Sequence, residues 1–250
     1  MSRLADIPLS QIPHCKGRAI IPILGIGSGT ALLYPAGVKQ ERHRTFGLLG
    51  TLVIIFVVVP LTRAEGLTSL VGGFLFSAVI LWGLWAVAAH RRQLTVGIVL
   101  MAPAFVLTIL HHVWPLNRGI ETAWMITNGL ALGFLVAVLL QRLFRTERVT
   151  ADTLSTAVSG YFLLGILWAF FYGIVAQLDP GAFRELADPD TREFFYFSFV
   201  TLTTLGYGDI SPVTNAARTV AVFEAVVGQL YLAITIARLV GLHIAAAVSR

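Results

Sequence analysis

The sequence predicts an all-α membrane protein, and three observations support this fold class. Of the 250 residues, 56% are hydrophobic and only 12% are charged, whereas a soluble domain carries roughly 25% charged residues. The mean hydropathy of +0.80 agrees with this bias. Charged residues are concentrated in short segments between long apolar stretches. The chain therefore has too few polar residues to cover the surface of a soluble fold of this length.

Six apolar stretches are long enough to cross a bilayer. A membrane-spanning helix needs about 20 apolar residues, and it must be helical because lipid offers its backbone no hydrogen-bond partner. The expected spans are residues 45–62, 66–90, 93–117, 122–141, 153–178 and 215–243.

Basic residues fall mainly on one side of these spans, which sets their orientation. The basic residues on the side of the N-terminus are Arg3, Lys16, Arg18, Lys39, Arg42, Arg44, Arg91, Arg92, Arg142, Arg145 and Arg148. Because the basic side of a membrane protein is cytoplasmic, we expect both termini in the cytoplasm and the protein in the plasma or inner membrane. The net charge of +5 is scattered between apolar runs, so no nucleic-acid-binding face is expected.

The N-terminal segment is harder to assign. Residues 19–34 are apolar but short, and they contain Pro22 and three glycines (Gly25, Gly27 and Gly29). We expect an interfacial or re-entrant element there, since a seventh span would put the N-terminal basic cluster outside. The first 18 residues lack the apolar core of a signal peptide, so we expect them to be retained. Cys15 is the only cysteine, which excludes an intrachain disulfide.

The segment between the last two spans differs from the other turns. It starts with an acidic, turn-rich stretch, continues as an apolar run from Thr191 to about Thr203, and ends in TTLGYGD. A helix over the apolar run would be roughly 20 Å long and would reach only the middle of the bilayer. Asp190 and Glu193 have the spacing of a capping pair at its start. Irregular backbone at that depth must line water or be buried in protein.

The TLGYG sequence of residues 204–208 resembles the selectivity filter of the tetrameric potassium channel family, whose loops read TVGYG. Glycines allow backbone conformations closed to other residues, so successive carbonyls can face one axis. Leu205 replaces the valine of the family, and its side chain is expected to pack behind the filter. The resemblance covers residues 153–241, as outer helix, pore helix, filter and inner helix. The first four spans agree with the family only in number and placement.

The resemblance implies a site and an assembly. The carbonyls of Thr204, Leu205, Gly206 and Tyr207, with the Thr204 hydroxyl, would replace the hydration shell of K⁺, and Gly208 completes the filter. One loop cannot close a ring, so four identical subunits would assemble. Residues expected to support the filter are Thr203, Asp209, Glu224, Tyr196 and Ser198. The expected partners are K⁺, identical subunits and lipid; no cofactor and no enzymatic activity are expected. GYGD alone would also fit an ordinary tight turn, and the acidic outer residues would either concentrate cations or simply be solvated.

Glu224 places a charge inside the sixth span, where charges are costly. One interpretation packs it behind the pore helix, bonded to Thr201, Ser198 or Tyr196. The other has it face the inner cavity and attract ions.

The sixth span also carries Gly228, at the position of the hinge glycine of the family. Helical spacing from this glycine predicts that Gln229, Leu232, Ile236 and Val240 line the inner cavity.

Two further groups have alternative interpretations. His111 and His112, near the outer end of the third span, would either sense external pH or be ordinary interfacial histidines. Arg142, Arg145 and Arg148 recur at every third residue, as in voltage sensors, but residues 122–141 before them carry no charge that the field could move. We therefore interpret them as topology determinants.

The predicted organisation has four parts: an N-terminal segment (1–44), a four-helix domain that does not sense voltage (45–141), a linker (142–152) and a pore domain (153–250). We expect no cytoplasmic ligand-binding domain after the last span, and the gating stimulus stays open. The predicted function is a potassium-selective channel. The alternatives are a less selective cation channel, a silent or regulatory subunit, and a carrier, although no second half matches the first as inverted-repeat carriers require.

Overall fold

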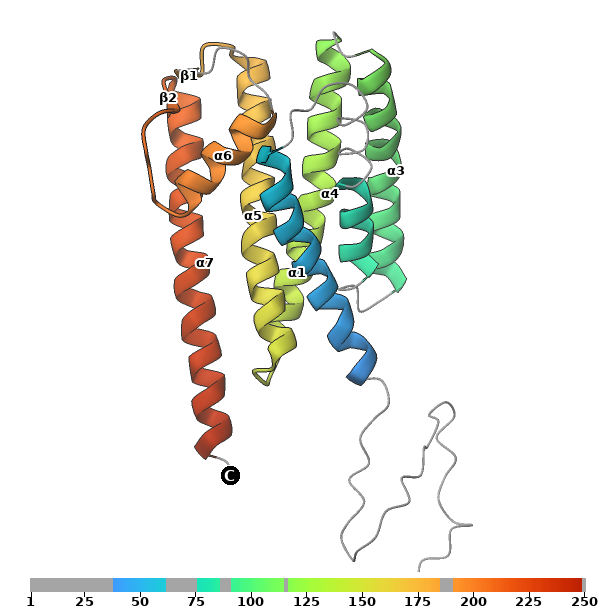
Figure 1. Cartoon of the computed structure of the whole chain (residues 1–250), viewed down its shortest axis with the longest axis vertical. Coiled ribbons are helices and arrows are strands. Elements are labelled where there is room, and N and C mark those ends of the chain that lie inside the picture. The colour runs from blue at the N-terminus through green and yellow to red at the C-terminus, as the bar shows by residue number, and fades with distance from the viewer. Residues whose placement is uncertain (1–37, 62–75, 86–90, 115–116, 185–190, 249–250) are drawn as a thin grey trace, which may run out of the picture. The chain divides into compact units, whose positions relative to one another are not determined.

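The computed structural model describes residues 38–61, 76–85, 91–114, 117–184 and 191–248, and these are almost entirely helical (Figure 1). The helices are α1 (Val38–Leu61), α3 (Arg91–Val113), α4 (Arg118–Arg145), α5 (Ala151–Leu178), α6 (Thr191–Leu202) and α7 (Asn215–Val248), with a further helix at Phe76–Trp85. The strands β1 (Phe183–Arg184) and β2 (Ser211–Pro212) form a short antiparallel pair. The predicted all-α class is confirmed. The chain divides into residues 1–43 and 44–250, and the second unit is described below.

Among the residues that the structure describes, four helices are long and apolar enough to cross a membrane: Arg91–His111 within α3, and the whole of α4, α5 and α7. The predicted first and second spans coincide with shorter apolar helices, Thr45–Val57 and Phe76–Trp85, within the described residues. The element expected at residues 19–34 and the cap expected at Asp190 lie outside those residues. The described part of the chain is therefore almost entirely helical and has four candidate spans, and the count of six stays a prediction.

α5 is the central helix of this unit. It contacts α4 on one side and α6 and α7 on the other (Figure 1). In its 18-residue stretch of high hydropathy, 61% is buried, against 17% for the corresponding stretch of α7. On α4, Leu132, Leu135 and Leu139 are fully buried at helical spacing, and Leu163 of α5 belongs to the same core. Burial by its own chain thus fixes α5, while most of α7 stays uncovered.

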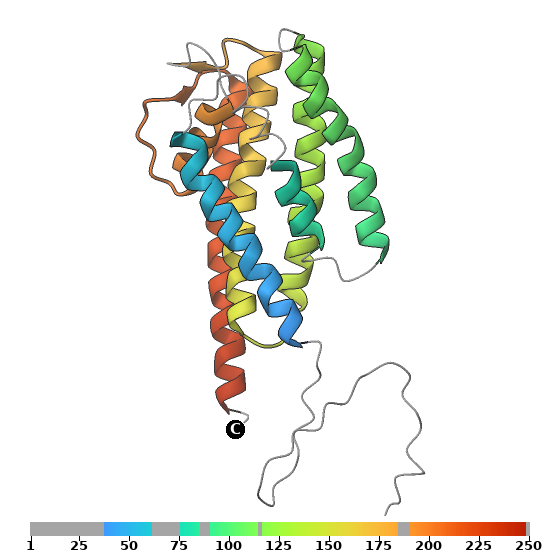
Figure 2. The same cartoon turned by 45° about the vertical axis from the view of Figure 1, so that its right-hand side comes forward.

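Aromatic side chains attach α1 to α5 and α6, and Figure 2 shows the ribbon of α1 beside these helices. The ring of Phe56 lies 5.3 Å from that of Phe162 on α5 and 4.9 Å from that of Phe199 on α6, both in edge-to-face geometry. Such pairs contribute roughly 0.5–1.5 kcal/mol beyond the area that they bury. The first helix therefore packs directly against the short helix that precedes TLGYG.

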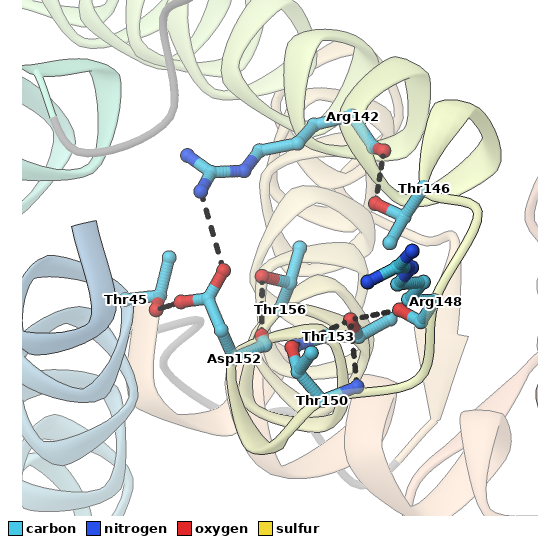
Figure 3. A network of polar contacts seen from close by, with 8 residues as sticks. All are labelled: Thr45, Arg142, Thr146, Arg148, Thr150, Asp152, Thr153 and Thr156. Carbon is cyan, nitrogen blue, oxygen red and sulfur yellow. Dashed lines mark hydrogen bonds and ion pairs between the residues drawn. The ribbon is translucent and has the colours of Figure 1, made fainter. Parts of the chain in front are cut away.

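A polar network joins the neighbouring ends of α1, α4 and α5 (Figure 3). Asp152, in the first turn of α5, accepts hydrogen bonds from the Thr45 hydroxyl of α1 and from Nη2 of Arg142 on α4, the latter at 3.2 Å. Thr150 and Thr153 cap the start of α5 reciprocally. Arg142 and Arg145 occupy the last turn of α4, and Arg148 follows that helix.

α7 joins this end of the unit through Arg238. Its Nη2 donates to the carbonyl oxygens of Phe144 and Thr146, at 2.7 and 2.9 Å. These carbonyls belong to the C-terminal end of α4, where a cation is favoured by the helix dipole. The far half of α7 is thus attached to the linker between α4 and α5.

Gly165 allows α5 and α6 to approach each other closely. A Cβ at this position would lie 2.6 Å from Cζ of Phe199, whose ring also packs against Phe56, Phe162 and Phe195 and so cannot move freely. We expect Gly165→Ala to lower stability, since overpacking costs about 1–3 kcal/mol and the gain in helix propensity is only about 1 kcal/mol.

Thermal unfolding of the purified protein in one detergent measures this effect. Gly241→Ala on α7 is the matched control, because a Cβ there meets nothing within 4 Å. Equal melting temperatures for the two variants would contradict the close approach of α5 and α6.

Candidate functional site

α6 lies between α5 and α7, and the chain after it turns back beside α7 towards β2 (Figure 1). The 12 residues of α6 give it a length of about 18 Å. The returning chain is held at its far end by the pairing of Phe183 with Pro212, and by a 2.8 Å hydrogen bond from the Val213 amide to the Ala182 carbonyl. Residues 203–210 are thus fixed at both ends.

The backbone of residues 204–208 alternates in handedness. The φ angles of Thr204, Gly206 and Gly208 are +59°, +57° and +79°, and no other described residue has a positive φ. The glycines adopt this region freely, whereas for Thr204 it costs roughly 1–2 kcal/mol. Alternation of handedness of this kind allows successive carbonyls to face the same side, which the family resemblance implies and which stays a prediction.

Hydrogen bonds occupy the first three amides of this segment, those of residues 204–206. The amides of Leu205 and Gly206 donate to the Val200 carbonyl, at 2.9 and 3.3 Å, and the Thr204 amide donates to Thr201. Within the part of the chain that the structure describes, the carbonyls of residues 204–207 accept no hydrogen bond. These four uncharged oxygens are therefore available to an outside partner. The described residues contain no cluster of His, Cys, Asp and Glu that would hold a metal ion instead.

Tyr196 and Asp209 clamp the end of the segment to α6. The Tyr196 hydroxyl donates to Oδ2 of Asp209 at 2.7 Å. This hydrogen bond lowers the pKa of Asp209 below its usual range and raises the pKa of Tyr196 to about 12, because it favours the ionised carboxylate and the protonated phenol. At the other end, the Thr203 hydroxyl donates to the Phe199 carbonyl at 2.6 Å.

Glu224 lies behind α6 and is fully buried. Its carboxyl group contacts the hydroxyls of Tyr172 on α5 and Ser198 on α6, the latter at 2.5 Å. Of the partners suggested by the sequence, Ser198 is therefore in contact, whereas Tyr196 bonds to Asp209. This placement agrees with the interpretation that packs Glu224 behind the short helix.

Gly228 is buried against the end of α6. A Cβ there would lie 2.7 Å from Cδ1 and 3.0 Å from the carbonyl oxygen of Leu202, and α7 continues through this position as one helix. The structure thus gives the glycine a packing role, while the hinge role stays a prediction. Of the predicted cavity residues, Gln229, Ile236 and Val240 are exposed in the single chain and Leu232 is half-buried.

Three tyrosines of this site escaped the sequence analysis. Besides Tyr172, the Tyr161 hydroxyl donates to the Leu202 carbonyl at 3.1 Å, and the Tyr231 hydroxyl donates to the Ala157 carbonyl at 2.5 Å. A buried tyrosine hydroxyl usually finds a hydrogen-bond partner, and this tendency is the signal that could have marked them. Of the two histidines, His111 stacks on Trp124 with ring centroids 5.0 Å apart.

Comparison with known proteins shows that the site lies within a region that matches a protein family. Residues 156–243, which cover most of α5, the whole of α6 and TLGYG, and most of α7, match the Ion_trans_2 family, described as an ion channel. No solved structure matches the chain significantly.

Several curated proteins match part of the chain. Protein LctB of Bacillus caldotenax is 26% identical over 122 residues, which are 46% of this chain and 90% of LctB. Human potassium voltage-gated channel subfamily A member 4 is 33% identical over 79 residues, 29% of this chain and 12% of that protein. Potassium channel K1 of Plasmodium berghei is 29% identical over 117 residues, 46% of this chain and 6% of that protein. The match to both potassium channels thus covers a small part of their length.

The clamp predicts a measurable pKa difference. Tyr196→Phe removes the donor to Asp209, so the folded-state pKa of the carboxyl should rise towards its ordinary value. Because that pKa is depressed in the wild type, the clamp is present at neutral pH and is lost as the pH falls through it. A titration of the Asp209 carboxyl by ¹³C NMR should show a higher midpoint in Tyr196→Phe.

Tyr231→Phe is the control, because its hydroxyl bonds to Ala157 and not to Asp209. An unchanged midpoint in Tyr196→Phe would show that the two side chains are not bonded in solution.

Proposed function

We propose that this chain is the subunit of a potassium-selective channel, with residues 204–208 as its filter. The observation that carries the proposal is the alternating backbone of this segment, with free carbonyls at residues 204–207. Stacked carbonyl oxygens replace the hydration shell of K⁺ in channels of this kind. The match of residues 156–243 to an ion channel family, and the similarity to two potassium channels, support it.

The exposure of the site supports assembly into a homotetramer. Leu205 and Tyr207 are 55% and 68% exposed in the single chain, although a filter needs oxygens on all sides of the ion. Large apolar side chains also stand exposed on α7, namely Val222, Phe223, Val226, Leu230 and Ile234. Identical copies and lipid would cover them, and a fourfold ring of the 204–208 segments would surround the ion. The C-termini of four α6 helices, each equivalent to about half a negative charge, would add to cation stabilisation.

The proposed channel is a six-span subunit with both termini in the cytoplasm, and it lacks a charged voltage sensor. The uncharged stretch 122–141 of α4 supports the last point, as does the bond of Arg142 to Asp152 at the end of that helix. The contacts of α1 with α6, and of Arg238 with the end of α4, would connect the other helices to the filter and to α7.

Reconstitution of the purified full-length chain into liposomes tests the proposal. We expect a K⁺ flux that exceeds the Na⁺ flux, and a loss of at least about tenfold in K⁺ flux for Gly206→Ala. An alanine at φ +57° has space around its Cβ but strains the backbone by roughly 1–2 kcal/mol, which corresponds to about tenfold in an equilibrium. Gly241→Ala, in open space on α7, should conduct as the wild type does.

Other outcomes identify the alternatives. Equal K⁺ and Na⁺ fluxes would indicate a less selective cation channel, and saturable uptake without unitary currents would indicate a carrier. A stable assembly without flux would indicate a silent subunit, and a purified dimer would overturn the filter assignment itself.

A further inference from the structure

The carboxyl group of Glu224 has no basic partner to balance a charge. It is fully buried on α7, and its hydrogen bonds are to the hydroxyls of Tyr172 and Ser198. Among the described residues, no Lys, Arg or His forms a salt bridge with it. An ionised carboxylate in such surroundings costs so much free energy that buried carboxyls without a cation usually bind a proton instead.

The number of protons available around Glu224 can be compared with the number of hydrogen-bond contacts. Ser198 Oγ lies 2.7 Å from the Gly165 carbonyl oxygen and 2.5 Å from Oε1 of Glu224, while Oε2 contacts the Tyr172 hydroxyl. A carbonyl oxygen only accepts, and each hydroxyl supplies one proton. Three oxygen–oxygen contacts therefore have two hydroxyl protons between them. If Ser198 donates to Gly165, the contact between Ser198 and Glu224 needs a third proton, which only the carboxyl can supply.

We propose that Glu224 is a neutral carboxylic acid that positions α6. In this arrangement Tyr172 donates to Oε2, the protonated Oε1 donates to Ser198, and Ser198 donates to the Gly165 carbonyl. The chain of donors starts on α5, passes through α7 and α6, and returns to α5. The inference rests on the proposed function only where it assigns Glu224 an effect on the filter.

The position of Ser198 explains how the acid would act on the filter. Ser198 lies on α6 two residues before Val200, whose carbonyl accepts the amides of Leu205 and Gly206. The aromatic rings of Phe197 and Phe183 pack on Tyr172 at 4.8 and 5.8 Å and keep its hydroxyl in place. Glu224 therefore holds the helix that anchors the 204–208 segment.

Infrared difference spectroscopy of the reconstituted full-length chain tests the proton directly. The wild-type minus Glu224→Gln spectrum at neutral pH should contain the C=O stretch of a protonated carboxylic acid. Glu147→Gln is the matched control, because Glu147 is exposed after α4 and should lose carboxylate bands only. A Glu224→Gln spectrum that loses carboxylate bands only would overturn the proposal, whether or not the protein conducts.

Rescue by the conservative variant tests the positioning role. A glutamine keeps one donor and one acceptor in place of the protonated acid, so Glu224→Gln should retain assembly and K⁺/Na⁺ selectivity within about twofold. Glu224→Leu leaves two buried hydroxyls without this partner and should lower selectivity about tenfold. If Gln impairs selectivity as much as Leu does, the neutral-acid role is wrong. If neither variant conducts because the wild type does not, the proposed function has failed, and the infrared band still decides the protonation.

Discussion

Polar groups in apolar surroundings favour hydrogen-bond partners within the protein, and the contacts that join α5, α6 and α7 follow from this constraint. The hydroxyls of Tyr161, Tyr172 and Tyr231 each bond to a carbonyl or carboxyl group on another helix. Ser198 does the same from α6. Against this background the free carbonyls of residues 204–207 stand out. Some buried groups of α5 also lack a partner, among them the hydroxyls of Ser155 and Ser159, but at residues 204–207 the free oxygens follow one another along the chain. In the proposed channel, a cation would supply the missing partner of these carbonyls.

The strained backbone of residues 204–208 depends on a rigid support. Thr204 is held at a positive φ, which a threonine adopts only when its surroundings compensate the cost. α6 supplies that compensation, because Val200 accepts two amides from the segment and Tyr196 holds Asp209. α6 is in turn fixed by close contacts at Gly165 and by the aromatic ring of Phe199. The conformation of the segment is therefore a property of three packed helices and not of its two glycines alone.

Local patterns in the sequence predicted the helices and the conformation of the TLGYG segment, whereas contacts between helices were beyond them. The start of α6 at Thr191 and its end near Thr203 followed from charge and apolar runs. Burial of Glu224 against Ser198 was one of two interpretations, since helical spacing alone does not say which face of α7 meets α6. Tyr172 was missed because an aromatic residue in an apolar span looks like core until a buried acid at the same depth requires a donor. Arg238 was missed for a similar reason, as its acceptors, Phe144 and Thr146, are backbone carbonyls without a side-chain signature.

The two faces of α7 make different contacts, and this difference affects how the helix could move. Its buried residues, Ala217, Glu224, Gly228 and Thr235, recur at intervals of one or two turns and form a single stripe. This stripe contacts α5 and α6, while the opposite face is exposed in the single chain. In the proposed channel, other copies and lipid would cover that face. Gly228 lies in the stripe, against the side chain and carbonyl of Leu202 at the end of α6. A bend of α7 at this glycine would change the contact with Leu202. Movement of the C-terminal half of α7 would therefore shift the end of α6, from which the 204–208 segment starts.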